Sequence, residues 1–135
     1  MYTTQAKVRS TIIIDGKLNP NIVGQSVAKL GELCGLQLPV WARVIIGEVS
    51  VIGKEEPLSE EKLCPILGMY RAPDFNAAVG MADRHIRFAG PGHTSVLYTN
   101  PLNKAHIDYF GRVIQTVRIL INTPAAQVRC TSSQC

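Results

Sequence analysis

The sequence predicts an α/β fold, with a mainly parallel sheet and flanking helices. Through the second half of the 135 residues, short aliphatic and β-branched runs alternate with amphipathic segments. Pairs such as Asp15-Gly16 and Asn19-Pro20 mark turns between segments. Hydrophobic residues make up 46% of the chain and charged residues 18%, which is typical of a globular domain with a buried core.

Four segments have the spacing of apolar residues that indicates a helix. The first is predicted over residues 5–12, and the second ends before Gly35, a residue type favoured just after helices. Asp74 can cap the third helix, and the fourth is predicted within residues 100–114. The predicted buried faces of the last three helices are Val23, Val27, Leu30 and Cys34; Phe75, Ala78, Val79, Ala82 and Ile86; and Ile107, Phe110, Gly111 and Ile114.

Four apolar runs predict strands, namely residues 43–51, 64–72, 94–99 and 117–123. The first is so rich in aliphatic residues that both of its faces are expected to be covered. Because the last three strands alternate with helices, the second half of the chain is predicted to form a parallel sheet with helices packed on it. The predicted connecting loops are 15–21, 37–42 and 53–64. Regular patterning ends at Gln127, so residues 128–135 are predicted to be an unrelated polar tail.

The composition argues against several classes of protein. The net charge of +4 does not indicate a nucleic-acid interface, because the basic residues are scattered and form no single stripe. No apolar run is long enough to cross a bilayer, and the N-terminus lacks a signal-peptide pattern, which favours a cytoplasmic protein. No metal site is expected, since the histidines are not grouped near the cysteines, and disulfides are not expected without a signal peptide. The cysteines are Cys34, Cys64, Cys130 and Cys135.

The stretch from Gly90 to Thr94 combines two glycines with a histidine. It lies between a predicted helix and a strand, the reverse of a dinucleotide-binding loop, and no third glycine follows. His93 stands where the strand begins, so its side chain can face a cleft and exchange a proton near neutral pH. The alternative is that His93 only caps the turn through a local hydrogen bond, and the spacing alone favours this structural role.

A second candidate site precedes the strand predicted at 64–72. A carboxylate at the start of a strand, such as Glu60 or Glu61, can hold ribose hydroxyls or act as a base, whereas most loop charges are simply solvated. Cys64 has no neighbouring histidine, lysine or helix start placed to lower its pKa, so packing is expected of it. Cys34 lies among apolar residues and is expected in the core.

Several long stretches together resemble the CoA-acylating aldehyde dehydrogenase family. They are GKLNPNIVGQSVAKLGELCGL, the stretch from VIIGEVSV to APDFNAAV, GHTSVLYTN and RILINTPAAQ. The resemblance runs from about Val8 to Gln127, in particular to the aldehyde dehydrogenase half of the bifunctional aldehyde–alcohol dehydrogenases. It implies that residues 1–127 are part of the catalytic domain of such an enzyme.

The resemblance implies an oxidoreductase of alcohol metabolism that uses NAD and coenzyme A to interconvert an aldehyde, such as acetaldehyde, and an acyl-CoA. Glu61, in the motif Glu-Lys-Leu-Cys-Pro, matches the glutamate that holds the nicotinamide ribose of NAD in the wider superfamily. His93 matches a histidine near the active site, which favours a supporting catalytic role over the cap. Cys64 replaces a small residue, in keeping with packing. Relatives are oligomers, so the implied partners are a second copy of the chain or the remainder of the enzyme.

The family's nucleophilic cysteine and Rossmann domain lie upstream of anything matched here, and none of the four cysteines takes the nucleophile's place. The chain by itself is therefore expected to be inactive and to bind neither NAD nor coenzyme A. One alternative is a truncated, non-catalytic fragment with an assembly role. Another is a piece that complements a separately encoded N-terminal part.

Overall fold

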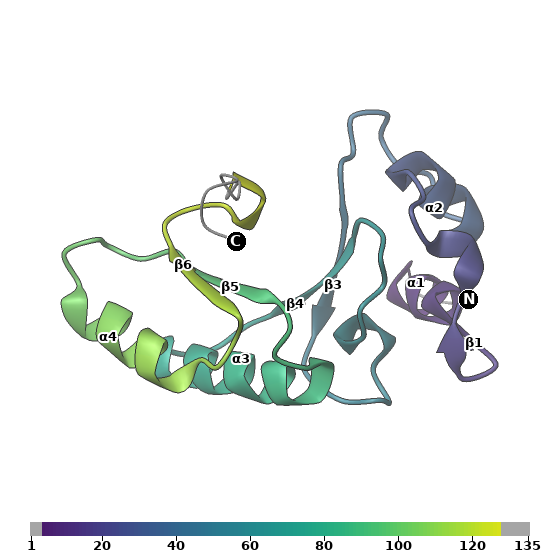
Figure 1. The fold of residues 1–135 in the computed structure, drawn as a ribbon. Helices are drawn as coiled ribbons and strands as arrows, with labels where there is room; N and C mark the ends of the chain where they lie inside the picture. Colours follow the sequence, from purple (N-terminus) through teal and green to yellow (C-terminus); the bar gives the residue numbers. More distant parts are fainter. Residues whose placement is uncertain (1–3, 128–135) are drawn as a thin grey trace, which may run out of the picture. The chain divides into compact units, whose positions relative to one another are not determined.

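The computed structural model describes residues 4–127, which form two compact units that divide after Arg71 (Figure 1). The first unit contains α1 (Thr4–Ile12), β1 (Ile13–Ile14), β2 (Lys17–Leu18), α2 (Val27–Cys34), β3 (Ile45–Val49) and β4 (Ile66–Tyr70). The second contains α3 (Phe75–Ala89), β5 (Thr94–Leu97), α4 (Lys104–Val113) and β6 (Arg118–Ile121). Short 3-10 turns are η1 (Pro20–Ile22), η2 (Pro57–Ser59) and η3 (Ala125–Gln127). Helices combined with parallel strand pairs confirm the predicted α/β class. The tail predicted over 128–135 lies outside the described residues.

Local sequence signals define the helix ends, and all four predicted helices are confirmed. The side chains of Ser26 and Asp74 cap α2 and α3, each accepting a hydrogen bond from the backbone amide three residues further on. Gly35 ends α2 in the left-handed conformation, with φ 62° and ψ 40°, as its position after the last apolar residue predicted.

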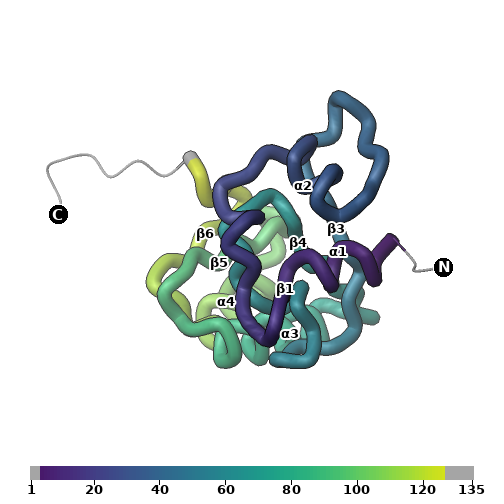
Figure 2. Tube along the Cα trace, turned by 90° about the vertical axis from the view of Figure 1, so that its right-hand side faces the viewer, coloured from purple at the N-terminus to yellow at the C-terminus, as the bar shows by residue number. Residues whose placement is uncertain are grey.

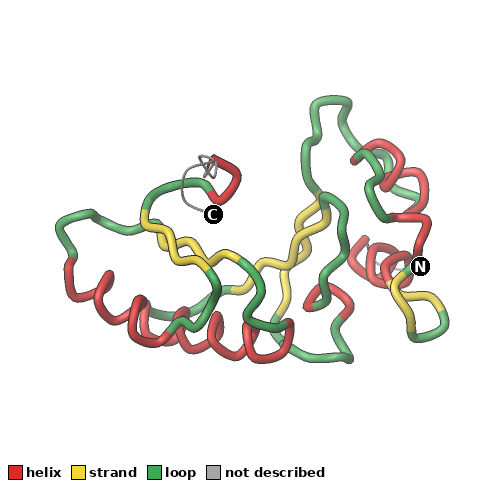
Figure 3. Tube along the Cα trace, viewed as in Figure 1, coloured by secondary structure: helices red, strands yellow, loops and turns green. Residues whose placement is uncertain are grey.

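The strands pair in three separate two-stranded sheets, drawn in yellow in Figure 3. β1 and β2 form an antiparallel hairpin around Asp15-Gly16, and β2 lies within the predicted loop 15–21, whereas β3–β4 and β5–β6 are parallel. The four longer strands are therefore confirmed, and so is the parallel pairing of β5 with β6, whereas β4 pairs in parallel with β3. The prediction of one sheet was wrong for the part of the chain described, because no ladder of hydrogen bonds joins one parallel pair to the other.

The core of the first unit lies between α1, α2 and one face of the β3–β4 pair. Along β3 the side chains alternate, with Ile45 and Val49 buried and Ile46 55% exposed. The prediction that both faces of this strand are covered was therefore wrong within the described residues. The helices α1 and α2 supply apolar side chains to one face of the strand. Val23, predicted for the buried face of α2, precedes the helix and is exposed.

The connection between α2 and β3 turns outward from the end of the helix, as Figure 2 shows. It has no regular secondary structure, as predicted, and it exposes two large apolar side chains, Val40 and Trp41. Such side chains on a loop add nothing to the core of this unit.

The core of the second unit lies between α3, α4 and the β5–β6 pair. Val79 of α3 meets Phe110 of α4 there, together with Ile114, and all three are buried. The rings of Phe75 and His106 stack with centroids 3.8 Å apart. Helical periodicity predicted this face, except that Ala78 and Gly111 are exposed.

A pair of glycines shapes the inner face of the β3–β4 sheet. Gly47 and Gly68 are register partners on adjacent strands. A Cβ atom on Gly47 would overlap Cδ1 of Leu58, and one on Gly68 would lie 2.9 Å from the Leu58 carbonyl oxygen. Leu58 is 2% exposed, so η2 packs its only large side chain onto the flat surface that the two glycines leave.

This packing gives a first prediction. Gly47→Ala forces Leu58 off the sheet, and we expect it to lower the free energy of unfolding by about 1–3 kcal/mol, as overpacked cores do. The measurement is urea unfolding followed by circular dichroism. The control is Gly111→Ala on α4, where a Cβ meets nothing within 4 Å and alanine favours the helix. Equal stability of the two variants would contradict the assigned role of Gly47.

Candidate functional site

The loop between β3 and β4 carries Glu61, the residue matched to the ribose-binding glutamate. Glu61 is exposed and lies five residues before the first residue of β4. Its carboxylate makes no hydrogen bond or ion pair with other residues of the described chain. The group is therefore available to accept hydrogen bonds from outside the chain. Glu60, the other carboxylate considered, is half-buried.

The neighbouring Lys62 has the opposite environment. It is only 8% exposed, and its Nζ donates hydrogen bonds to the carbonyl oxygens of Leu58, at 2.9 Å, and of Glu60. Burial lowers the pKa of this ammonium group, and nearby acidic groups oppose that effect. No sequence signal points to the burial of Lys62, because a lysine within a run of charged loop residues is expected to be solvated.

The backbone after Lys62 is held on both sides. Leu63 has φ 50°, a left-handed conformation that is uncommon for a leucine, and its side chain is 58% exposed. Its carbonyl oxygen accepts a hydrogen bond from the Gly24 amide at 2.9 Å, and that of Pro65 accepts one from the Ile45 amide at 2.9 Å. These bonds tie the loop to the turn before α2 and to the start of β3.

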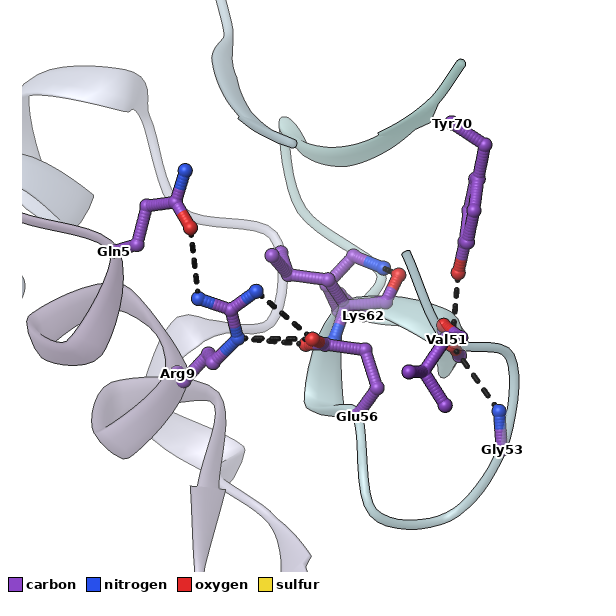
Figure 4. Close-up of polar contacts among 9 residues, drawn as sticks. Gln5, Arg9, Val51, Gly53, Glu56, Lys62 and Tyr70 are labelled. Atoms are coloured by element: carbon purple, nitrogen blue, oxygen red, sulfur yellow. Dashed lines mark hydrogen bonds and ion pairs between the residues drawn. The ribbon is translucent and has the colours of Figure 1, made fainter. Parts of the chain in front are cut away.

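An ion pair joins the other end of the loop to helix α1 (Figure 4). Arg9 donates from Nε and Nη2 to the Glu56 carboxylate at 2.8–3.0 Å, and Glu56 also accepts from the Leu58 amide at 3.0 Å. The side chain of Glu56 is 11% exposed. Burial by itself would raise the pKa of the Glu56 carboxyl, but the hydrogen bonds from Arg9 and Leu58 and the nearby positive charges hold it below its ordinary value.

Ser59 supplies a third anchor for the loop. It is 1% exposed, and its Oγ lies 2.8 Å from the Tyr70 hydroxyl and 3.2 Å from the Val51 carbonyl oxygen, to which it donates. The Gly53 amide donates to the same Oγ. The segment predicted as a plain charged loop is thus a packed structure from which Glu61 projects.

The two described cysteines lie in or beside the core and are not paired in a disulfide. Cys34 is buried in the first core, as predicted, and Cys64 is half-buried against the same cluster. Burial raises the pKa of the Cys64 thiol, which disfavours the reactive thiolate. Their environments agree with packing roles. Cys130 and Cys135 lie outside the described residues.

His93 lies in the second unit, directly before β5, with its side chain exposed. Its imidazole makes no hydrogen bond with any described residue, so the cap considered as its alternative role is not formed here. The turn is instead held by the Pro91 carbonyl, which accepts from the Val117 amide at 3.1 Å, and by Thr94 Oγ1, which accepts from Arg118 Nε at 3.0 Å. Glu61 and His93 belong to different units, and each is described by itself.

Residues 4–127 carry neither a cluster of metal-ligating side chains nor a membrane-spanning helix. No group of three or more histidine, cysteine, aspartate or glutamate side chains there is arranged to hold a metal ion. None of the helices described is both long and apolar enough to cross a membrane.

The Arg9–Glu56 pair generates a second prediction. Glu56→Gln keeps the shape of the side chain but removes the charged acceptor, and we expect a loss of about 1–2 kcal/mol at pH 7. Because folding lowers the pKa of Glu56, its contribution is complete above the unfolded value of about 4.3 and is lost as pH falls through the folded value. The gap in stability between wild type and variant should therefore narrow from pH 6 to pH 3.

The control for this measurement is Glu32→Gln, since Glu32 pairs with Lys29 on the exposed surface of α2. A change below about 0.5 kcal/mol is expected there. Urea unfolding at a series of pH values provides both comparisons. A gap for Glu56→Gln that stays constant with pH would refute the ionised pair.

Comparisons with known proteins agree in sequence and in fold. The chain is 48% identical over 131 residues to the bifunctional aldehyde-alcohol dehydrogenase AdhE of Escherichia coli (strain K12), covering 93% of this chain and 15% of that protein. It is 34% identical over 122 residues to the succinate-semialdehyde dehydrogenase (acetylating) of Clostridium kluyveri, covering 90% of this chain and 26% of the relative. No protein-family model matches the sequence.

The fold matches solved structures over the same extent. The acetylating aldehyde dehydrogenase of Geobacillus thermoglucosidasius superposes with a TM-score of 0.84 and 30% sequence identity, over 90% of this chain and 26% of that structure. The chain thus spans about a quarter or less of the length of these relatives. On sequence and fold together, the chain is similar to one part of the acetylating aldehyde dehydrogenases.

Proposed function

We propose that this chain is part of an oxidoreductase that interconverts an aldehyde, such as acetaldehyde, and its acyl-CoA. The observation that carries the proposal is the 48% identity over 131 residues to a bifunctional aldehyde-alcohol dehydrogenase. In the complete reaction NAD accepts the hydride of the aldehyde and coenzyme A accepts the acyl group. A cytoplasmic oligomeric enzyme is proposed with it, on the same similarity.

Glu61 is proposed to hold the nicotinamide ribose. The requirement is a carboxylate that is free to accept hydrogen bonds from two adjacent hydroxyl groups. Glu61 meets this requirement because it is exposed and has no partner among residues 4–127, while Lys62 and Ser59 next to it are buried and bonded. A fixed backbone with a free carboxylate suits a binding residue.

His93 is proposed to support the acyl-transfer step. An exposed imidazole without an internal partner can donate a hydrogen bond to the carbonyl oxygen of the reacting group, or orient coenzyme A. The bonds from Val117 to Pro91 and from Arg118 to Thr94 hold the backbone on either side of it. The turn therefore does not need the His93 ring for its own stability.

The nucleophilic thiolate of the reaction is proposed to come from outside the described residues. Cys34 is buried in the core, and burial raises the pKa of Cys64, so neither has the environment of a reactive cysteine. Because the resemblance gives none of the four cysteines the place of the nucleophile, the 135-residue polypeptide by itself is proposed to be inactive. Its partner would be the remainder of the enzyme, in the same protein or as a separate chain, or further copies.

The third prediction concerns the activity of the polypeptide by itself. Purified protein of these 135 residues should not reduce NAD when supplied with acetaldehyde and coenzyme A, as followed by absorbance of NADH. The positive control is a full-length acetylating aldehyde dehydrogenase under the same conditions. Turnover above the uncatalysed rate that a cysteine-to-serine change at any of the four positions abolishes would disprove this part of the proposal.

The fourth prediction tests the role of His93 in a full-length aldehyde dehydrogenase that carries this segment. His93→Asn should lower kcat/KM by tenfold or more, equivalent to about 1.4 kcal/mol of lost transition-state stabilisation. The melting temperature should not change, because the exposed ring has no partner among the described residues. The comparison variant for the kinetics is His85→Asn on α3, which should leave kcat/KM unchanged. Unchanged kinetics with a lowered melting temperature would leave His93 as a structural residue.

A further inference from the structure

The proposed function assigns no role to the buried Lys62. A buried lysine is unusual, because the ammonium group loses its hydration, and here its hydrogen-bond partners are backbone carbonyls. These carbonyls belong to Leu58 and Glu60, so they stand within the same loop as Glu61. The ammonium group therefore closes the loop on itself directly beside the candidate ligand-binding carboxylate.

We propose that Lys62 is a positioning residue for Glu61: it fixes the backbone on the N-terminal side of Glu61 so that the carboxylate faces the cofactor. This inference rests on the proposed function of Glu61.

Local geometry explains how Lys62 sets the direction of its neighbour. Exposure alternates along this segment, with Glu61 and Leu63 exposed and Lys62 between them buried. The two hydrogen bonds of Nζ hold the Lys62 side chain inward, and the side chains on either side of it remain exposed. The bond from Nζ to the Glu60 carbonyl then restrains the peptide that links Glu60 to Glu61.

The second carbonyl connects the loop to its most constrained point. Leu58 is held on the Gly47–Gly68 surface of the sheet and is buried. Lys62 Nζ donates to the Leu58 carbonyl at 2.9 Å. Through this bond, the backbone next to Glu61 is held relative to the β3–β4 sheet and not only relative to the loop. Beyond Lys62, the bond from the Gly24 amide to the Leu63 carbonyl holds the other side.

A purely stabilising lysine would be the simpler explanation, and the two roles predict different couplings. If Lys62 acts through Glu61, removing its ammonium group matters for cofactor binding only while the Glu61 carboxylate is present. If it only stabilises the fold, its effect on binding does not depend on Glu61. A double-mutant cycle measures this difference.

The experiment uses the full-length aldehyde dehydrogenase that carries this segment, with NAD as the ligand and its dissociation constant measured by calorimetry. Lys62→Met keeps the aliphatic stem and removes the three donors. We expect it to weaken NAD binding about tenfold, as Glu61→Gln does, because each removes or misdirects a charge-assisted hydrogen bond. The double variant should bind no more weakly than Glu61→Gln by itself. Lys54→Met, an exposed lysine in the same loop, should have no effect.

The outcomes separate this inference from the proposed function. Unchanged NAD binding in Glu61→Gln would overturn the assigned role of Glu61. If Glu61→Gln weakens NAD binding as expected, Lys62→Met has to weaken it too, and not additively. No effect of Lys62→Met, or a fully additive one, would overturn only the role of Lys62. If Lys62→Met does not fold, Lys62→Gln replaces it, because glutamine retains donors within a shorter side chain. The same loss of additivity is then required.

Discussion

The contact of Leu58 with the Gly47–Gly68 pair is the constraint on which the candidate site depends. Both glycines leave the inner face of the β3–β4 sheet flat, and Leu58 fills that surface with an almost fully buried side chain. Burial of a leucine contributes about 2 kcal/mol, which is large for a loop of this length. Because η2 is seated there, the polar residues around it acquire fixed positions instead of sampling solvent.

Three polar anchors surround that apolar contact. The Arg9–Glu56 pair joins the loop to α1, and the Ser59–Tyr70 contact joins it to β4. Lys62 connects two points within the loop through its bond to the Leu58 carbonyl. Each anchor satisfies a side chain that would otherwise be costly to bury, and none of the buried side-chain polar atoms described lacks a hydrogen-bond partner. The network leaves Glu61 out, which is the property expected of a residue kept for a ligand.

The turn that carries His93 is also held by hydrogen bonds that do not involve its exposed side chain. The backbone of this turn is held by a bond from the Val117 amide, and the strand that follows is held by the side chain of Arg118 on its register partner. Gly90 has φ 98°, a conformation that only glycine adopts readily, whereas Gly92 has open space around it and no such requirement. Rigid backbone therefore presents an unbonded imidazole, as rigid backbone presents an unbonded carboxylate at Glu61.

The sequence by itself determined the order of the four helices and the four longer strands, because helix periodicity and caps such as Asp74 and Gly35 act within a few residues. It also indicated the family, through motifs that include Glu61 and His93. Tertiary structure alone decided which charged residues of the 53–64 loop are buried: Glu56 and Lys62 go inward and Glu61 stays outside. That choice depends on Arg9, which is 47 residues away along the chain, and on two glycines that meet only through strand register. The number of strands in each sheet and the exposure of one face of β3 could likewise not be predicted from local sequence, since both depend on which segments are brought together in space.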